Sequence, residues 1–499
     1  MTLIPHLPVL QIVLPLIGAP ICTVLGGRRL AWAFALLFCG IALAISVMLL
    51  IQVQAGGTIR YDIGNWVPPY GIEYRVDALS SIVLVIVAAI ATTVLVYSRA
   101  SVEAEIPAAQ HRYFYTAYLL AVTGLLGMTV TGDAFNVFVF LEISSLATYV
   151  LIALGRHRRA LYAAYQYLIL GTIGATFYVI GIGLLYMMTG TLNMDDLAAR
   201  LAPLHENRVV LAAFAFLVAG LGLKVAMFPL HLWLPKAYTY APSAVSALLA
   251  ATATKVGLYV MIRVLFGIFG ADYAFAEVPL GLVLVALGSI AAIAGSLVAV
   301  FQDEVKRLLA YSSVAQIGYI ILGIGLASHL GLTAATVHLF NHAVMKGALF
   351  LVAGCWVYSL GSAQFSQLAG VGRRMPLVTA AFVVGGLGMI GVPGTVGFVS
   401  KWYLLQGAVS AEMWPAVVAI VISSLLAVAY VWKVVEVAYF QPAPADVAGV
   451  PRAGRTLLPL SMLVPTLLLT LAGIYFGLDT RLPLGMAQAA SDLMLGGTP

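Results

Sequence analysis

The sequence has very little charge. Only 9% of its 499 residues are Asp, Glu, Lys or Arg, whereas a soluble domain has about 25%. Hydrophobic residues make up 62% of the chain, and the mean hydropathy is +1.04. The longest polar stretches, near residues 54–77 and 440–456, span only about 17–24 residues. This composition excludes a sizeable soluble domain and predicts an all-α polytopic membrane protein.

Signatures of cofactor chemistry are also missing. The three cysteines, Cys22, Cys39 and Cys355, lie in apolar segments without CxxC spacing, so we expect them to be buried small hydrophobes. No Walker motif, no GxGxxG after a strand and no Cys/His ligand set is present. We therefore predict no cofactor and a transporter subunit rather than an enzyme, driven by an ion gradient or by a partner. The net charge of +6 is spread over loops, which argues against nucleic acid as a partner.

A removable leader is not expected at the start of the chain. The segment MTLIPHLPVLQIVLPLIG lacks a basic n-region and a small-residue cleavage site. Both features are typical of secretory signal peptides. We therefore predict that this segment is retained as the first membrane helix.

Apolar runs bounded by polar residues, Gly or Pro predict fourteen transmembrane helices. The expected spans are 8–26, 30–53, 77–98, 113–130, 133–153, 160–189, 208–234, 242–268, 279–301, 306–327, 331–358, 377–408, 413–439 and 456–477. An even number of spans places both termini on the same side of the membrane.

Charges in the loops predict the orientation. The odd-numbered loops and their helix ends hold 15 basic residues and the even side holds 6, while twelve acidic residues lie on the even side. The positive-inside rule then places the odd loops in the cytoplasm. We expect a multi-pass protein of a bacterial cell (inner) membrane with both termini extracytoplasmic.

Two of the predicted helices carry a related break. In GLGLKVAMFPLHLW, Gly222 precedes Pro229 by seven positions, and in GLGMIGVPGTVGF, Gly386 precedes Pro393 by seven. The two helices, the seventh and the twelfth, are five apart, so the units that contain them have opposite orientations. This is the pattern of an inverted repeat with broken helices at the transport site, although an ordinary proline kink is the alternative for either helix alone.

The repeat predicts four parts of the chain. They are an N-terminal three-helix segment (1–112), a first five-helix repeat of helices four to eight (113–268), a second of helices nine to thirteen (279–440), and a C-terminal helix and tail (441–499).

Five ionisable residues lie well inside apolar runs: Glu142, Lys224, Lys255, Lys346 and Lys401. Each is roughly 7–13 residues from the nearest end of its run, which at about 1.5 Å per residue is deep in the hydrocarbon. A lone charge there costs at least about 2.5–3.5 kcal/mol, so such residues are rare and usually functional. The series predicts a path for charge, and we expect the charge to be protons.

Glu142 and Lys224 form the first predicted element of this path. A nearby carboxylate keeps the amine charged, so a protonatable Glu142 would control whether Lys224 holds its proton. A structural carboxylate tied to a neighbouring backbone group, or to Ser144 or Ser145, is the alternative. Lys255 follows four alanines and two threonines, which allow close helix packing and leave room for water.

His338, His342 and Lys346 are spaced i, i+4, i+8 and form one stripe along a helix. We predict a proton relay, because both nitrogens of a neutral imidazole are usable. Structural histidines bonded to the backbone are the alternative. A metal site is not expected, because the stripe has no carboxylate ligand and no HExxH glutamate.

His231 and Lys401 are the remaining candidates. His231 follows the Pro229 break and could bridge Lys224 and Lys255 through water, or cap freed carbonyls. Lys401 follows the Pro393 break and could be the terminal donor or acceptor, or an interfacial anchor. Aromatic residues near the ends of apolar runs are expected at the membrane interface; they are Trp66, Tyr70, Trp233, Tyr238 and Tyr240.

These features resemble the antiporter-like family shared by respiratory complex I, membrane-bound hydrogenases and Mrp-type cation/proton antiporters. The matching stretches are FVFLEISSLATYVL, GLKVAMFPLHLWLPKAYTYAPSAVSALLAATATKVGLY, HLFNHAVMKGALFLVAG and GVPGTVGFVSKW. The chain looks most like the D-type subunit of Mrp antiporters. It lacks the length for the long lateral helix of the largest complex I antiporter-like subunit, and it has Lys401 where a similar complex I subunit carries glutamate.

The resemblance implies a Glu142–Lys224 pair, a bridging Lys255 and an exit lysine at 401, joined by a hydrated axis. It also implies partner membrane subunits in a heteromeric complex that exchanges protons for Na⁺ or K⁺ across the bilayer. Alternatives are the pumping subunit of a complex I-type or hydrogenase redox complex, the energy-coupling subunit of another enzyme, and a stand-alone channel.

Overall fold

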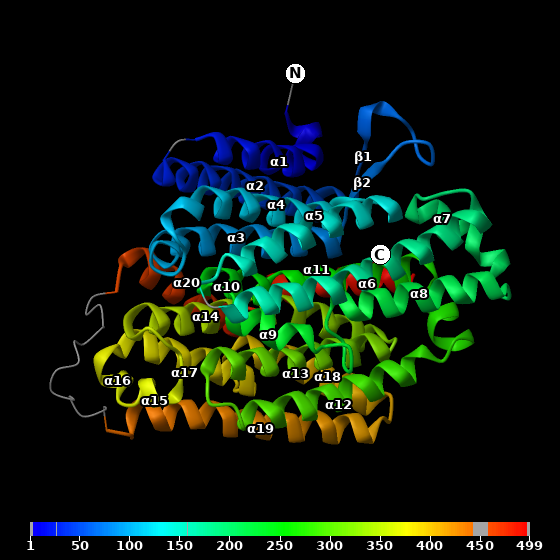
Figure 1. Ribbon diagram of the computed structural model, residues 1–499. Coiled ribbons are helices and arrows are strands. Elements are labelled where there is room, and N and C mark those ends of the chain that lie inside the picture. The colour runs from blue at the N-terminus through cyan, green and yellow to red at the C-terminus, as the bar shows by residue number, and fades with distance from the viewer. Residues whose placement is uncertain (1–2, 26, 157, 443–457, 497–499) are drawn as a thin grey trace.

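The structure is a computed structural model, and it describes residues 3–25, 27–156, 158–442 and 458–496. Its helices lie side by side with their axes roughly aligned across the molecule (Figure 1). Within the described residues, twelve helical stretches are long and apolar enough to cross a membrane. The helices in them are α1 (Leu7–Val24), α2 (Arg28–Gly56), α3 (Ala78–Glu105), α4 (His111–Val130), α5 (Ala134–Ala153), α6 (Arg158–Thr189), α10 (Ser243–Ala251) with α11 (Ala253–Ile262), α12 (Leu280–Val300), α13 (Val305–Gly325), α14 (His329–Leu360), α19 (Trp414–Tyr439) and α20 (Leu460–Leu478).

Two further helices are interrupted at the prolines that the sequence singled out. The chain leaves α8 (Arg208–Lys224) before Pro229 and becomes helical again in α9 (Trp233–Tyr240). It leaves α17 (Pro376–Ile390) before Pro393 and resumes in α18 (Val396–Ser410). Both prolines are exposed. The predicted total of fourteen spans counts these two interrupted helices, and both that total and the inverted repeat remain predictions.

A third interruption was not expected. The predicted span 242–268 divides into α10 and α11 at Thr252, whose φ of −127° and ψ of −54° are not helical. It then ends in a π-helical turn, Arg263–Ile268. No proline marks the break, so the apolar pattern alone gave no signal for it.

The two ends of the bundle carry the short elements. At one end, the antiparallel hairpin of β1 (Ile59–Asp62) and β2 (Glu73–Val76) lies near α7 (Met194–Leu201), as Figure 1 shows. At the other end lie α15 (Phe365–Leu368) and α16 (Val371–Arg374). The hairpin forms the only sheet within the described residues, and it occupies the polar stretch 54–77.

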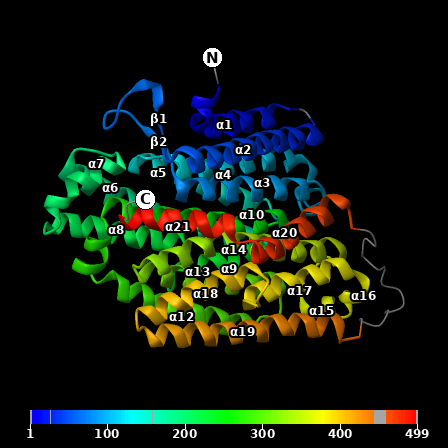
Figure 2. The same cartoon turned by 180° about the vertical axis from the view of Figure 1, so that it is seen from behind.

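The chain ends in two helices laid end to end (Figure 2). They are α20 and α21 (Arg481–Leu495), and both follow α14 in the antiparallel sense. Thr466 contacts Cys355 near one end of α14, and Ser491 Oγ is 2.9 Å from Thr333 Oγ1 near the other. The tail predicted after the final membrane helix is thus itself helical up to Leu495 and packs along α14. Arg452 and Arg455, two of the basic residues counted in the odd-numbered loops, and the start of the predicted helix 456–477 lie outside the described residues.

Burial confirms one expectation about side chains and corrects another. All three cysteines are buried. Trp66 and Tyr70 are exposed in the hairpin loop, but Trp233 and Tyr238 are fully buried and do not lie at an interface. Trp233 stacks on Tyr167 with ring centroids 3.9 Å apart, so its prediction as an interfacial residue was wrong: the helix break before it turns α9 into the bundle.

Glycines set the closest helix contacts. A Cβ on Gly220 of α8 would lie 2.6 Å from the carbonyl oxygen of Gly174 in α6, and a Cβ on Gly288 of α12 would lie 2.6 Å from that of Gly318 in α13. Small residues of this kind let backbones approach in membrane bundles, where van der Waals packing drives association. Each half of the chain thus contains a helix pair held at glycine contact.

Gly220→Ala should therefore destabilise the protein by about 1–3 kcal/mol, because the added methyl group overpacks a backbone contact. The matched control is Gly183→Ala in α6, where a Cβ would meet nothing within 4 Å. That change should be neutral or slightly stabilising, since alanine favours the helix by about 0.5–1 kcal/mol. Thermal unfolding in detergent measures both variants. Equal melting temperatures would contradict the packing described.

Candidate functional site

Lys401 lies against the end of an interrupted helix. Its Nζ donates to the carbonyl oxygens of Met389 (2.9 Å) and Ile390 (3.0 Å), the last two residues of α17. A third hydrogen bond reaches Ser424 Oγ of α19 at 3.0 Å. Carbonyls at a helix C-terminus lack intrahelical partners and carry partial negative charge, so they are well suited to an ammonium group. The break after α17 therefore provides the seat for this amine.

The seat depends on Gly391. This residue follows α17 with φ +91°, in the left-handed region that glycine adopts without strain. A Cβ there would lie 2.9 Å from Lys401 Cδ. Glycine thus allows both the turn of the backbone and the passage of the lysine stem.

Lys255 uses a helix end in a similar way. Its Nζ donates to the carbonyl oxygen of Ala250 in the last turn of α10, and it lies 3.5 Å from Thr254 Oγ1. The break at Thr252 exposes this carbonyl. Lys255 has no exposed surface, so all of its polar partners come from the protein interior.

Lys346 is fully buried in the middle of α14. Its Nζ donates to Leu309 O (2.8 Å) and Ser312 Oγ (2.5 Å) of α13. His342 and His338 follow on the same helix face, with their rings stacked at 5.9 Å between centroids. Lys346 and Lys255 both interact electrostatically with His342. The predicted stripe of His338, His342 and Lys346 therefore lies in the core, and His342 interacts with both Lys346 and Lys255.

The stripe continues toward Lys401. His338 Nδ1 is 2.7 Å from Ser400 Oγ, next to Lys401 on α18. Its ring meets Tyr319 edge to face at 5.7 Å, and Lys401 Nζ lies 4.9 Å from the centroid of the same tyrosine ring. The structure therefore brings Lys255, Lys346, both histidines and Lys401 into one series of neighbours.

Lys224 is the last residue of α8, and its ammonium donates to Ser145 Oγ of α5. Glu142, one turn earlier on α5, interacts with Lys224 electrostatically but is not within 4.0 Å of it in the described structure. Glu142 is half-buried, on the stripe of α5 that carries the exposed Val139 and Leu146. Serine, rather than glutamate, is thus the direct partner of this amine.

No direct link joins Lys224 to Lys255 in the described part of the chain. The stem of Lys224 packs on α11, where a Cβ on Gly257 would lie 3.6 Å from Lys224 Cγ. His231, which the sequence suggested as a bridge, is half-buried, stacks on Phe228 and hydrogen-bonds to neither lysine. The predicted constellation is therefore two groups of residues with a gap between them.

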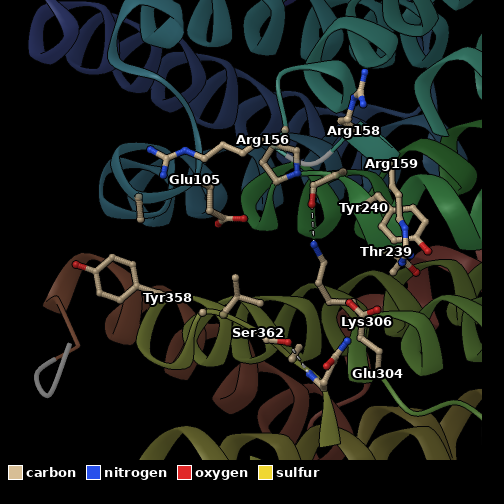
Figure 3. A pocket seen from close by; sticks show the side chains of 18 of the residues that line it. Glu105, Arg156, Arg158, Arg159, Thr239, Tyr240, Glu304, Lys306, Tyr358 and Ser362 are labelled. Atoms are coloured by element: carbon tan, nitrogen blue, oxygen red, sulfur yellow. Dashed lines mark hydrogen bonds between the residues drawn. The ribbon is translucent and has the colours of Figure 1, made fainter. Parts of the chain in front are cut away.

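A cavity of about 1140 Å³ opens at the bundle end near α15 (Figure 3). It is lined by charges of both signs, including Glu105, Arg156, Arg159 and Lys306. Lys306 is buried, and its Nζ donates to Ala241 O at 2.6 Å. We call this cavity the vestibule. Lys306 lies one turn before Leu309 on α13, so the vestibule wall continues along α13 to the residues that bind Lys346.

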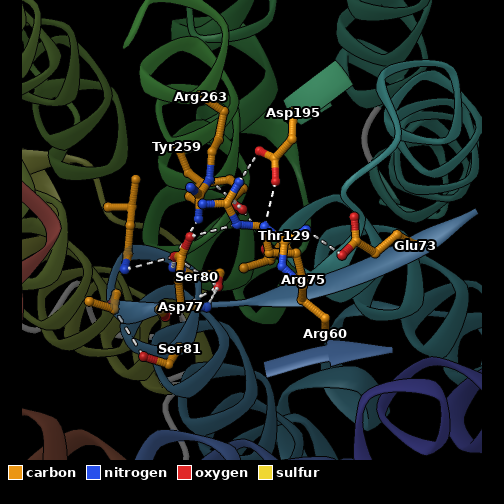
Figure 4. A network of polar contacts seen from close by, with 12 residues as sticks. Arg60, Glu73, Arg75, Asp77, Ser80, Ser81, Thr129, Asp195, Tyr259 and Arg263 are labelled. Atoms are coloured by element: carbon orange, nitrogen blue, oxygen red, sulfur yellow. Dashed lines mark hydrogen bonds and ion pairs between the residues drawn. The ribbon is translucent and has the colours of Figure 1, made fainter. Parts of the chain in front are cut away.

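The opposite end carries a network of ion pairs (Figure 4). Buried Asp77 pairs with Arg263, and its Oδ2 lies 3.5 Å from Arg75 Nε. Burial opposes ionisation of Asp77, but the two arginines and the N-terminal amides of α3 hold the pKa of its carboxyl below the ordinary value. Arg75 also pairs with Asp195 of α7. Sequence inspection missed this network because it joins segments up to 186 residues apart.

Partners of the buried amines were likewise missed, because small hydroxyl residues are common in membrane helices. Ser145 was considered only for Glu142. The other amine partners with no distinguishing sequence signal are Thr254, Ser312 and Ser424, and the same holds for Ser400, the partner of His338.

Interrupted helices that seat buried amines define a polytopic membrane protein of the ion-translocating class. The family model described as "NADH:quinone oxidoreductase/Mrp antiporter, TM" matches residues 131–427, which is more than half of the chain. The chain belongs to this family, as the motifs had indicated.

Relatives carry names from both branches of the family. The chain is 44% identical over 488 residues to "NADH-quinone oxidoreductase subunit N" of Desulforudis audaxviator, covering 95% of this chain and 96% of the relative. It is 30% identical over 366 residues to the D-type subunit of a Na(+)/H(+) antiporter of Alkalihalophilus pseudofirmus, covering 73% of each. A chain in the solved structure of the Mrp complex from Dietzia sp. DQ12-45-1b superposes with a TM-score of 0.89 at 27% identity, covering 100% of this chain and 98% of that one.

Lys401→Met should lower the melting temperature of the purified protein. The carbonyls of Met389 and Ile390, one buried and one partly buried, lose their donor, and each unsatisfied buried group costs about 1–3 kcal/mol. Lys401→Arg keeps a donor near the end of α17 and should recover part of the loss. A melting temperature for Lys401→Met equal to that of the wild type would show that these carbonyls do not depend on the amine.

Proposed function

We propose that this chain is the proton-translocating membrane subunit of a multisubunit monovalent cation (Na⁺ or K⁺)/proton antiporter. The observation that carries the proposal is a set of four buried amines that donate to hydroxyls and main-chain carbonyls. They are those of Lys224, Lys255, Lys346 and Lys401. Within the described residues, no carboxylate oxygen lies within 4.0 Å of any of the four Nζ atoms. A buried charge without a counter-ion costs several kcal/mol, which raises the free energy of the charged amine toward that of the neutral amine. Each amine can therefore release and regain a proton at a modest cost in free energy.

The histidine stripe supports proton transfer between Lys346 and Lys401. Both ring nitrogens of His342 and Nε2 of His338 have no protein hydrogen-bond partner among the described residues. Buried polar groups nearly always find a partner, and bound water is the usual one when no protein group is available. Water between these rings would complete a relay in which each imidazole accepts a proton on one nitrogen and releases one from the other.

The vestibule is the inlet in this proposal. Its floor residue, Lys306, and the seat of Lys346 lie on the same face of α13, one turn apart. The vestibule opens among loops with many basic residues, which the positive-inside rule assigns to the cytoplasm. The hairpin end and both termini then face the outside of a bacterial cell (inner) membrane.

Partner subunits supply what this chain lacks. No nucleotide or redox motif is present in its sequence, so the chain needs an ion gradient or a mechanically coupled partner. The relatives' names and the Mrp complex structure support other membrane subunits as partners. Glu142 lies on the outward stripe of α5, so a partner seated there could bias the charge of Lys224 from outside the chain.

The second candidate is the pumping subunit of a complex I-type redox complex. The relative named NADH-quinone oxidoreductase subunit N, at 44% identity over 95% of this chain, favours it. The buried amines serve both candidates equally, since the two differ in what drives the proton and not in how it moves. The identity of the partner subunits separates them.

Lys224→Met and Glu142→Gln should each lower proton-linked transport by at least about tenfold, equivalent to about 1.4 kcal/mol of barrier. Methionine keeps the volume of the stem without the amine, and glutamine keeps the shape of the carboxylate without its charge. Transport is measured by pH-dye quenching in vesicles that contain the native complex, with assembly checked on a native gel.

Lys236→Met is the matched control. Lys236 is half-buried and lies 5.1 Å from the ring centroid of Tyr162, away from the buried series. Transport should be unchanged in this variant. Wild-type transport in assembled Lys224→Met would remove the proton relay from consideration.

Purification of the native complex distinguishes the two driving partners. Small membrane subunits alone are expected for the antiporter, with cation-dependent proton movement in proteoliposomes. Co-purifying Fe–S or flavin subunits would instead assign the chain to a redox complex.

A further inference from the structure

A polar stripe leads from Lys255 toward the hairpin end of the molecule. Lys255 and Tyr259 of α11 and Arg263, the first residue of the π-helical turn that follows it, are spaced i, i+4, i+8, so they share one face. The stripe covers about 12 Å at 1.5 Å per residue. Helical side chains lean toward the N-terminus of their helix, so each residue of the stripe leans over the one before it. All three are buried, although this segment is otherwise apolar.

The far end of the stripe is closed by an ion pair. Arg263 Nε donates to Tyr259 Oη at 3.0 Å, and its Nη2 pairs with Asp77 Oδ1. Tyr259 Oη in turn donates to Thr129 O at 2.9 Å. Asp77 is 1% exposed and Arg263 is 6% exposed, so the pair separates the stripe from the surface.

Beyond the pair lies a second set of carboxylates. A cavity of about 10 Å³, roughly the space for one water molecule, is lined by Arg263, Tyr259, Glu73 and Asp195. Asp77 Oδ2 has no hydrogen-bond partner among the described residues. Arg75 also lines the cavity; it pairs with Asp195, and its Nε lies 3.5 Å from Asp77 Oδ2. The guanidinium of Arg263 therefore faces Asp77 on one side and, across a water-sized space, two carboxylates that already pair with Arg60 or Arg75.

A purely structural role accounts poorly for this arrangement. Removing two charges from water costs several kcal/mol per ion, so a buried pair is often no more stable than apolar residues of the same volume. The hairpin is already tied to α7 by Arg60, which reaches both Glu73 (2.8 Å) and Asp195 (2.7 Å). The π-helical turn that begins at Arg263 is a local irregularity of a kind frequent at functional sites.

We propose that Tyr259, Arg263 and Asp77 form a gated outlet for protons from Lys255 to the hairpin end, with the Asp77–Arg263 ion pair as the gate. In the closed state the guanidinium occupies Asp77 and its positive charge repels an approaching proton. In the open state it joins Arg60 and Arg75 at Glu73 and Asp195, which frees Asp77 Oδ1 as an acceptor while Oδ2 stays beside Arg75. The inference rests on the proposed function, because it assigns an outlet to the same proton path.

One proton is passed per opening. The Lys255 ammonium releases it and becomes a neutral amine. The Tyr259 hydroxyl accepts that proton while releasing its own, so the tyrosine ends unchanged. The released proton binds the free Asp77 carboxylate and leaves to water when Arg263 returns to Asp77.

The test uses the complete complex in sealed vesicles, with two variants of opposite expected sign. Arg263→Gln removes the repelling charge and should raise the passive proton leak about tenfold. Adding Lys255→Ala should abolish that leak. Asp77→Asn removes the acceptor and leaves Arg263 unpaired, and it should lower coupled transport about tenfold without any leak. Arg200→Gln is the matched control, because it breaks an arginine–aspartate pair on α7 away from the stripe, and it should change neither quantity.

If the Asp77–Arg263 ion pair is purely structural, the expected result is different: Arg263→Gln and Asp77→Asn both lose assembly or stability, and neither variant leaks protons. An assembled Arg263→Gln complex without a Lys255-dependent leak overturns the gate. If that variant does not assemble, Tyr259→Phe decides: transport about tenfold lower with normal assembly supports the outlet, and unchanged transport overturns it. A wild-type complex that moves no protons would instead count against the proposed function, and the gate and the function are thereby distinguished.

Discussion

An amine buried in a bilayer needs oxygen partners, and an interrupted helix needs donors for its free carbonyls. The fold satisfies both needs with the same contacts. Lys401 donates to the last two carbonyls of α17, Lys255 donates to the last turn of α10, and Lys224 is itself the last residue of α8. Without the breaks Lys401 and Lys255 would lose their main-chain acceptors, and without these amines the carbonyls would lose a donor in a medium without water. Lys346 and Lys224 are seated differently, on unbroken α13 and on Ser145 of α5. The reciprocity therefore explains why a break lies beside Lys401 and Lys255.

The two ends of the molecule differ in how their charged residues are arranged. The vestibule end is a wide opening with charges of both signs, and Lys306 on its floor is bonded to a main-chain carbonyl. The hairpin end is compact, and its buried Asp77 and Arg263 neutralise each other. An open end equilibrates quickly with solvent, whereas a closed ion pair must separate before a charge passes. In the proposed path, this asymmetry distinguishes the two ends even though the buried amines between them are chemically alike.

Much of this was legible in the sequence, for a physical reason. A lysine inside an apolar run and a proline inside a helix are each costly, so their positions are informative, and the breaks at Pro229 and Pro393 were found where expected. The break at Thr252 was missed because it carries no costly residue. The Asp77–Arg263 pair was missed because each residue stands near the end of an apolar run, where a charge is unremarkable. The hairpin and α21 were missed because polar and amphipathic stretches do not reveal their packing.

The gap between Lys224 and Lys255 has a consequence for coupling. No hydrogen bond joins them and His231 does not bridge them in the described structure, so a proton has no fixed route from one to the other. Charges interact within each of the two groups. Two unit charges about 10 Å apart interact by about 1.7 kcal/mol at an effective dielectric constant of about 20, which exceeds the free energy of one pKa unit, about 1.4 kcal/mol. The electrostatic partner of Lys224 is Glu142, whereas Lys255 acts on Lys346 and the two histidines. The gap therefore separates two groups of residues that are each coupled internally, and a transfer between them would need bound water or a movement of the helices.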